Sequence, residues 1–140
     1  MASTASRMVS FLLLGLICAW ASLAECGTFT SYGPQTYQRA AGNPVPVVTN
    51  FAIANPATSY TLKIYNGGRA GTQTGARVSS AVISLNGAAI VGPQNFNEKI
   101  GEISFPIKVL ASNQLTVELR SAPGSLIVIE IEGIDNASPI

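Results

Sequence analysis

Apolar and polar residues alternate along most of this chain, and that alternation limits the fold more than any other feature. In residues 60–65, Tyr60, Leu62 and Ile64 occupy every second position, with more polar residues between them. Successive side chains of a β-strand leave on opposite faces, so this run predicts a strand with one buried face. The same pattern recurs at Val47 to Ile53, Ile103 to Val109, Leu115 to Leu119 and Ile127 to Ile131. We therefore predict an all-β domain.

Turn residues separate the predicted strands. Asn86 and Gly87 form a dipeptide that strongly favours a two-residue hairpin, since both positions need positive φ. Ala122 to Ser125 contains the Pro-Gly pair of a type II turn, which we expect to join the strands starting at Leu115 and Leu126 as a hairpin. This spacing predicts about eight short antiparallel strands in a single β-sandwich, either jelly-roll or immunoglobulin-like.

Two further features concern the place of strands within a sheet. Ala81 to Leu85 and Leu126 to Ile129 carry apolar residues on both faces, so they are either central strands or strands that a neighbouring molecule covers. Pro106 interrupts one of the alternating runs. Because proline has no N–H to donate, it predicts an edge strand or a bulge there.

The first 24 residues have the layout of a secretory signal peptide. A region with one charged side chain, Arg7, precedes an apolar run over residues 11–20, and small residues follow. We predict cleavage between Ala24 and Glu25, which makes the protein secreted, extracellular or displayed on the cell surface. The apolar run is shorter than the about 20 residues of a membrane-spanning helix. Two alternatives stay open: a retained anchor helix, and lipidation of Cys26, which would attach the domain to a membrane.

The expected organisation is a signal peptide at 1–24, an N-terminal arm or leading strand at 25–44, a β-sandwich domain at 45–135 and a C-terminal tail at 136–140. Cleavage removes Cys18, so Cys26 has no intramolecular partner and no disulfide framework is expected; a disulfide between the Cys26 residues of two chains stays an open alternative. The chain has eight Lys and Arg residues against seven Asp and Glu residues, and loss of Arg7 makes the numbers equal. A neutral mature chain does not attract phosphates, which argues against nucleic-acid binding.

Catalytic groups are scarce. The chain has no His, so neither a Ser-His-Asp triad nor a zinc site with His ligands can form. Glu118, Glu130 and Glu132 are expected to be solvated surface charges, with Arg120 pairing across the hairpin to Glu130 or Glu132. We predict no enzymatic activity and no cofactor.

One metal alternative stays open near the C-terminus. Calcium prefers clustered carboxylate and carbonyl oxygens. Glu132, Asp135 and Asn136 offer a small set of such groups, and a structural calcium ion bound by them together with backbone carbonyls is the alternative.

Two polar loops are the candidate binding surface. The first runs from residue 66 to residue 75, and the second from residue 92 to residue 97. Amides, a guanidinium and an aromatic face together suit an uncharged polar ligand such as a glycan. In the alternative interpretation the loops are solvated turns, and Phe96 closes the end of the core. The candidate ligand-binding residues are Tyr65, Asn66, Arg69, Gln73, Asn95 and Asn97.

Several segments together resemble a β-sandwich module that recurs in large secreted and cell-surface proteins of bacteria. The resemblance is carried by Tyr60 to Gly68, Arg77 to Gly87, Ile90 to Asn97 and Asn113 to Ser125. It extends over residues 45–134 and implies a fold and an extracellular location. No activity is assigned to the module.

A weaker resemblance is to the jelly-roll carbohydrate-binding modules. It rests on the order of a Tyr-Thr-Leu strand at residue 60, an Asn-Gly turn, an Asn-x-Leu-x-Val strand at residue 113 and a final apolar strand. The resemblance implies sugar stacking on Trp or Tyr in loops at one end, often with a structural calcium ion. The only Trp, Trp20, lies in the predicted signal peptide, which leaves Tyr for this role.

We therefore expect a secreted or cell-surface module that binds or adheres without catalysis and recognises a glycan or a surface protein through its end loops. The alternative is a structural subunit of an extracellular assembly, such as a filament or a surface layer. In that case the N-terminal arm adds a strand to a neighbouring copy, and the chain self-associates.

Overall fold

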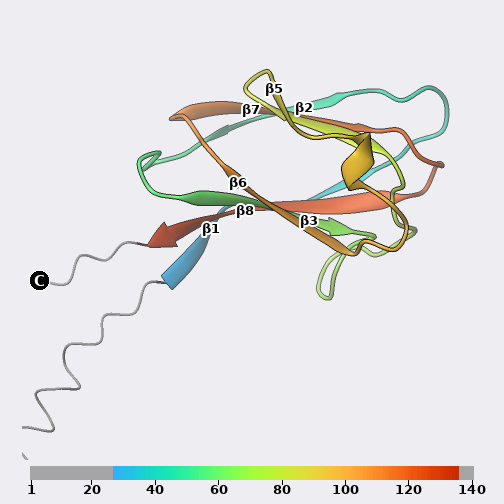
Figure 1. The fold of residues 1–140 in the computed structure, drawn as a ribbon, viewed down its shortest axis with the longest axis horizontal. Coiled ribbons are helices and arrows are strands. Elements are labelled where there is room, and N and C mark those ends of the chain that lie inside the picture. Colours follow the sequence, from blue (N-terminus) through green and yellow to red (C-terminus); the bar gives the residue numbers. More distant parts are fainter. Residues whose placement is uncertain (1–26, 136–140) are drawn as a thin grey trace, which may run out of the picture. The chain divides into compact units, whose positions relative to one another are not determined.

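The computed structural model describes residues 27–135, which form eight strands in two antiparallel sheets (Figure 1). This confirms the predicted all-β sandwich. The predicted signal peptide, the Ala24–Glu25 cleavage position, Cys26 and the tail at 136–140 lie outside the described residues. Among the residues described, no helix is long and apolar enough to cross a bilayer.

Each sheet has four strands. Sheet A contains, in spatial order, β1 (Gly27–Gln38), β8 (Leu126–Asp135), β3 (Tyr60–Asn66) and β6 (Glu102–Ile107). Sheet B contains β2 (Val47–Ala52), β7 (Ser112–Leu119), β4 (Ala81–Leu85) and β5 (Ala88–Val91). A short 3-10 helix, η1 (Pro93–Asn95), lies between β5 and β6. β4 and β8 are central strands and β6 is an edge strand, as the sequence predicted from the two-sided apolar runs and from Pro106.

The chain changes sheet at every connection between these strands except the β4–β5 hairpin. This order is that of a jelly roll, the first of the two predicted arrangements. In the hairpin, Asn86 and Gly87 have φ values of 52° and 83°, as a two-residue turn of this type requires. That part of the prediction is confirmed.

The second predicted hairpin is wrong. The turn at Ala122–Ser125 exists, since Ser125 donates its N–H to the Ala122 carbonyl at 3.2 Å and Gly124 has a φ of 89°. However, β7 belongs to sheet B and β8 to sheet A, so the turn carries the chain from one sheet to the other. A Pro-Gly turn fixes the local reversal of the chain and leaves the pairing partners open.

The core lies between the sheets and consists of the inward series that the alternation predicted. In sheet A, Ile64 of β3 is opposite Ile103 of β6 and Ile129 of β8. In sheet B, Val117 of β7 is opposite Ile83 of β4. The fully buried inward side chains include Leu62, Ile64, Ile83, Leu115, Val117, Ile127, Ile129 and Ile131.

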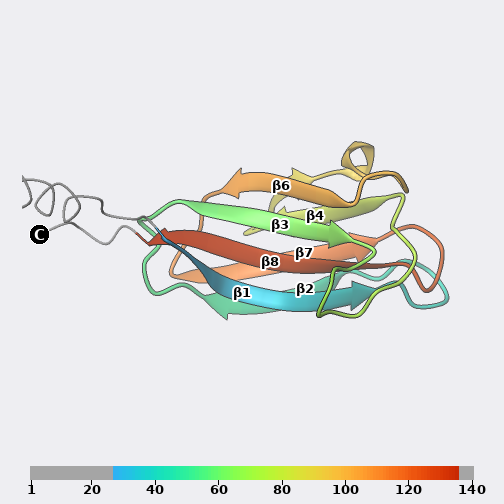
Figure 2. The same ribbon diagram turned by 90° about the horizontal axis from the view of Figure 1, so that it is seen from below.

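The strand directions place the long loops together. The start of β1 and the end of β8 lie at one end of the sandwich, which we call the terminal end (Figures 1 and 2). Four connections lie at the opposite, distal end: residues 39–46, 67–80, 92–101 and 120–125. Both predicted binding loops are at the distal end.

Part of the predicted N-terminal arm is a strand of the sandwich. Residues 27–38 form β1, next to β8 in sheet A, and residues 28–135 form one compact unit. The Tyr37 hydroxyl joins the two sheets, because it bonds to the Tyr32 hydroxyl at 2.6 Å and to Thr49 Oγ1 of β2 at 3.2 Å. The Tyr32 ring packs on Phe51 at 4.8 Å between centroids. Burial raises the pKa of Tyr37 well above its ordinary value, with the Tyr32 hydroxyl contributing.

Replacing Tyr37 with Phe removes both hydroxyl contacts and keeps the ring. The free energy of unfolding at neutral pH is expected to fall by about 1–2 kcal/mol. The pKa of Tyr37 in the folded state lies above the unfolded value of about 10, so the contribution of Tyr37 to stability is complete below pH 10 and is lost as the pH rises beyond it. The variant should lose less stability in that range. Urea unfolding at a series of pH values measures both effects, and identical slopes above pH 10 would contradict the account.

Candidate functional site

Asn66, the last residue of β3, links the two candidate loops. Its side chain is buried, and Nδ2 donates to the carbonyl oxygens of Val78 at 2.9 Å, Ile100 at 3.0 Å and Asn97 at 3.3 Å. Its Oδ1 accepts the N–H of Val78 at 2.6 Å. One side chain therefore joins the loop between β3 and β4 to the loop between β5 and β6.

The alternation of β3 explains why Asn66 is buried. It continues the inward series of Leu62 and Ile64, so strand geometry directs its side chain toward the core. A buried amide without partners costs about 1–3 kcal/mol, and here the backbone of the crossing loops supplies them. Asn113 of β7 occupies the corresponding inward position at the terminal end, where it bonds the N–H and the carbonyl of Leu110.

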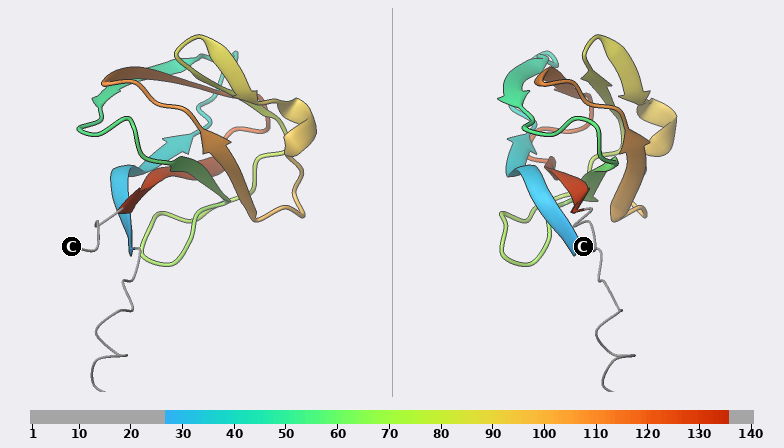
Figure 3. Two further views of the ribbon diagram at one scale, coloured as in Figure 1. Left: turned by 60° about the vertical axis from the view of Figure 1, so that its left-hand side comes forward. Right: turned by 90° about the vertical axis from the view of Figure 1, so that its left-hand side faces the viewer.

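The loop after Asn66 folds over the outer face of sheet A (Figures 2 and 3). Gly68 has a φ of +87°, and a Cβ there would lie 2.1 Å from the Gln73 carbonyl oxygen, so only glycine fits this position. Gly67 donates its N–H to the Leu126 carbonyl at 2.9 Å, which attaches the loop to the start of β8. Leu126 and Val128, on the outer face of β8, are fully buried.

Arg69 anchors this loop to sheet A. Its guanidinium forms an ion pair with Glu130 of β8 and lies 4.9 Å from the centroid of the Tyr65 ring. The Tyr65 hydroxyl donates to Glu130 at 3.4 Å. Burial, followed by the Glu130 charge, raises the pKa of Tyr65, and the hydrogen bond to Glu130 raises the pKa of Arg69. One face of Tyr65 is therefore occupied by the protein's own cation.

The predicted surface carboxylates differ from expectation. Glu130 is only 4% exposed because the loop covers it, so its assignment as a solvated charge is wrong. Arg120 does not pair across a hairpin. Its Nε forms an ion pair with Oε1 of Glu118, two residues earlier in the chain, at 2.6 Å. Glu132 pairs with Lys63 at 2.9 Å, and the hydrogen bond to Glu132 raises the pKa of Lys63. The predicted pairing of Arg120 with Glu130 or Glu132 is wrong because β7 and β8 lie in different sheets.

The second loop is held by its own asparagines. Asn95 Oδ1 accepts the N–H of Gly92 at 2.9 Å, and Asn97 Oδ1 accepts the N–H groups of Lys99 at 2.7 Å and Ile100 at 3.1 Å. Phe96 is 5% exposed and belongs to the core, as the alternative interpretation of this loop predicted. The aromatic face of this loop is therefore not available to a ligand.

A shallow hollow lies where the two loops meet. It is lined by Ser79, Asn97, Glu98 and Lys99, all of them exposed, and has a volume of about 450 Å³. Arg77 Nη1 donates to the Glu98 carbonyl at 3.1 Å and adds a second link between the loops. Ser79, Glu98 and Lys99 were not among the predicted residues. No signal in the sequence identifies them, because they come together only where the fold brings the two loops into contact through Asn66.

The structure divides the six predicted ligand residues into three groups. Asn66, Asn95 and Asn97 bond the loop backbones. Tyr65 and Arg69 lie with Glu130 on the outer face of sheet A. Gln73 is exposed and donates to Gln38 Oε1 at 3.4 Å. Only Asn97 of the six also lines the hollow.

The metal alternative has no cluster to support it within residues 27–135, where no three Asp, Glu or Cys side chains lie close enough together to hold an ion. Of its three suggested ligands, Glu132 pairs with Lys63, Asp135 is exposed and Asn136 lies outside the described residues.

The chain matches no protein-family model, and no curated protein is significantly similar to it.

Replacing Asn66 with Ala should destabilise the protein by about 3 kcal/mol. The change leaves the buried Val78 N–H and the facing carbonyls without their partner. The matched control is Asn50→Ala on the exposed outer side of β2, for which we expect a change within about 0.5 kcal/mol. Chemical denaturation measures both, and equal losses would show that Asn66 does not hold the distal end.

Proposed function

We propose that this protein is a non-enzymatic binding module of the extracellular space or the cell surface, which recognises an uncharged polar ligand, such as a glycan or the surface of a glycoprotein, at its distal end. The observation that carries this proposal is the joining of two long loops by the buried Asn66 side chain. Loops held in one conformation lose little entropy on binding, which favours their use for recognition.

The chemistry of the distal surface supports this ligand class. The hollow between the loops is lined by hydroxyl, amide, carboxylate and ammonium groups, with Gln94 and Gln73 exposed on the same loops. Such groups bond to sugar hydroxyls as donors and acceptors. Because Arg69 covers one face of Tyr65, we assign the main contacts to this hollow and give Tyr65 no stacking role.

The position of the loops also favours recognition. The start of β1 and the end of β8 are at the terminal end, so a connection through either of them would direct the distal end outward (Figure 2).

The proposal of a non-enzymatic role rests on the absence of His from the sequence and on the pairing of Glu118, Glu130 and Glu132 with basic side chains.

The alternative, a subunit of an extracellular assembly, is supported by a different observation, the exposed edge of β2. The route through the N-terminal arm is less favoured, because residues 27–38 already form β1 beside β8. Donation of that segment to a neighbour would require β1 to leave its own sheet.

A glycan array probed with residues 25–140 tests the proposed function. The Ser79→Arg side chain fills the hollow. We expect it to raise the dissociation constant for any glycan that binds by at least about tenfold, which corresponds to about 1.4 kcal/mol. The matched control is Ser112→Arg, an exposed serine at the terminal end. If Ser112→Arg loses binding while Ser79→Arg retains it, the ligand does not bind in this hollow. If the folded wild-type protein binds no glycan on the array, the ligand is not a glycan.

A further inference from the structure

Exposed apolar side chains are concentrated along the free edge of sheet B. Among the described residues, three of the six large apolar side chains that are exposed lie here: Val45 at 71%, Val47 at 49% and Val48 at 53%. They belong to β2 and to the residues just before it. Exposed large apolar side chains of the described residues are therefore most concentrated at this edge, which is typical of an interaction surface.

β2 differs from the other three edge strands in lacking protection. Natural sheets block edge-to-edge pairing with proline, charge or very short strands. β1 contains Pro34, β6 contains Pro106 and Glu102, and β5 has four residues. β2 has six residues without proline or charge, and no charged residue occurs anywhere in 40–62. Pro44 and Pro46 precede β2, so the unprotected part of this edge is residues 47–52.

The backbone of β2 is oriented for a further strand. Ile53, just after β2, donates its N–H to the Ala111 carbonyl at 3.0 Å. In an antiparallel ladder the residues alternate, so the odd-numbered positions bond β7. The N–H and C=O groups of Val48, Asn50 and Ala52 consequently point away from β7, along the open edge.

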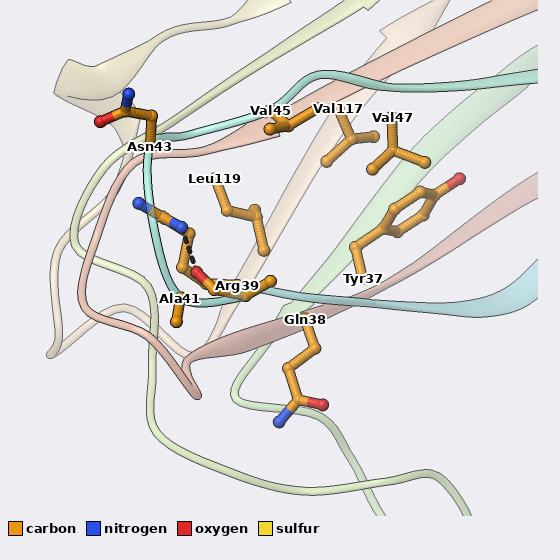
Figure 4. A pocket seen from close by; sticks show the side chains of 10 residues that line it. Tyr37, Gln38, Arg39, Ala41, Asn43, Val45, Val47, Val117 and Leu119 are labelled. Atoms are coloured by element: carbon orange, nitrogen blue, oxygen red, sulfur yellow. Dashed lines mark hydrogen bonds between the residues drawn. The ribbon is translucent and has the colours of Figure 1, made fainter.

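A hollow beside this edge suits an aliphatic side chain of an added strand. It has a volume of about 130 Å³, and Figure 4 shows Tyr37, Val45, Val47, Val117 and Leu119 gathered around it. An added strand places alternate side chains on the inner side of the sheet, next to Val47. Main-chain hydrogen bonds supply affinity in this type of recognition, and such hollows supply specificity.

We infer that β2 pairs edge to edge with β2 of a second copy of this chain, which joins two B sheets into one continuous sheet. The charge pattern selects this partner. A neutral strand meets its own copy without like-charge repulsion, and it offers no ion pair to a charged segment.

This pairing is independent of the proposed binding at the distal end, because it uses the lateral edge and needs no ligand. A six-residue edge buries less area than a standard interface of about 1,600 Å², so we expect association at micromolar concentrations or above.

The test is sedimentation equilibrium of residues 25–140 over a concentration series. We expect the average mass to rise from the monomer toward the dimer. Val48→Lys places a charge on the exposed edge and should weaken association by at least about tenfold, with partial recovery at high salt. Asn50→Pro removes an N–H that points to the free edge and should have the same effect without salt recovery.

The matched control is Ser84→Lys. Ser84 and Val48 both lie opposite Thr116, so Ser84 has the same orientation two strands farther from the edge. It should leave the dissociation constant nearly unchanged. A wild-type protein that stays monomeric at every concentration, or association that persists in both edge variants, would overturn the inference.

Discussion

Each strand of this protein has one face that must leave water, and the chain satisfies this requirement by alternating between two sheets. Only the β4–β5 hairpin stays within one sheet. All other connections must cross the end of the core, so their backbone groups need polar partners there. Asn66 at the distal end and Asn113 at the terminal end supply them from inward positions of β3 and β7. The same topology gathers the long loops at one end.

The sequence predicted the features that depend on neighbouring residues. The alternation in β3 and β7 identified their buried faces, and Asn86-Gly87 identified the one hairpin. It did not predict the partners of β7 and β8, because the turn at Ala122–Ser125 is compatible with a hairpin and with a crossing. Burial of Glu130 was missed for a related reason, since the loop that covers it comes from a distant part of the sequence.

The candidate site was predicted in position but not in detail. Asn66, Asn95 and Asn97 were chosen as ligand residues because they are amides in loops, yet their side chains bond the backbone. The alternation contained a signal for Asn66, because it continues the inward series of β3. No comparable signal exists for Ser79 and Lys99, which come together only because the two loops meet.

The central claim is that Asn66 holds the distal loops in one conformation. Amide hydrogen exchange of residues 25–140, followed by NMR, tests it most directly. We expect the Val78 and Ile100 amides, which bond the side chains of Asn66 and Asn97, to exchange as slowly as amides within β3. The exposed loop positions Ala70 and Gly71 should exchange much faster. If Val78 and Ile100 exchange as fast as Ala70 and Gly71, the loops are not held and the account is contradicted.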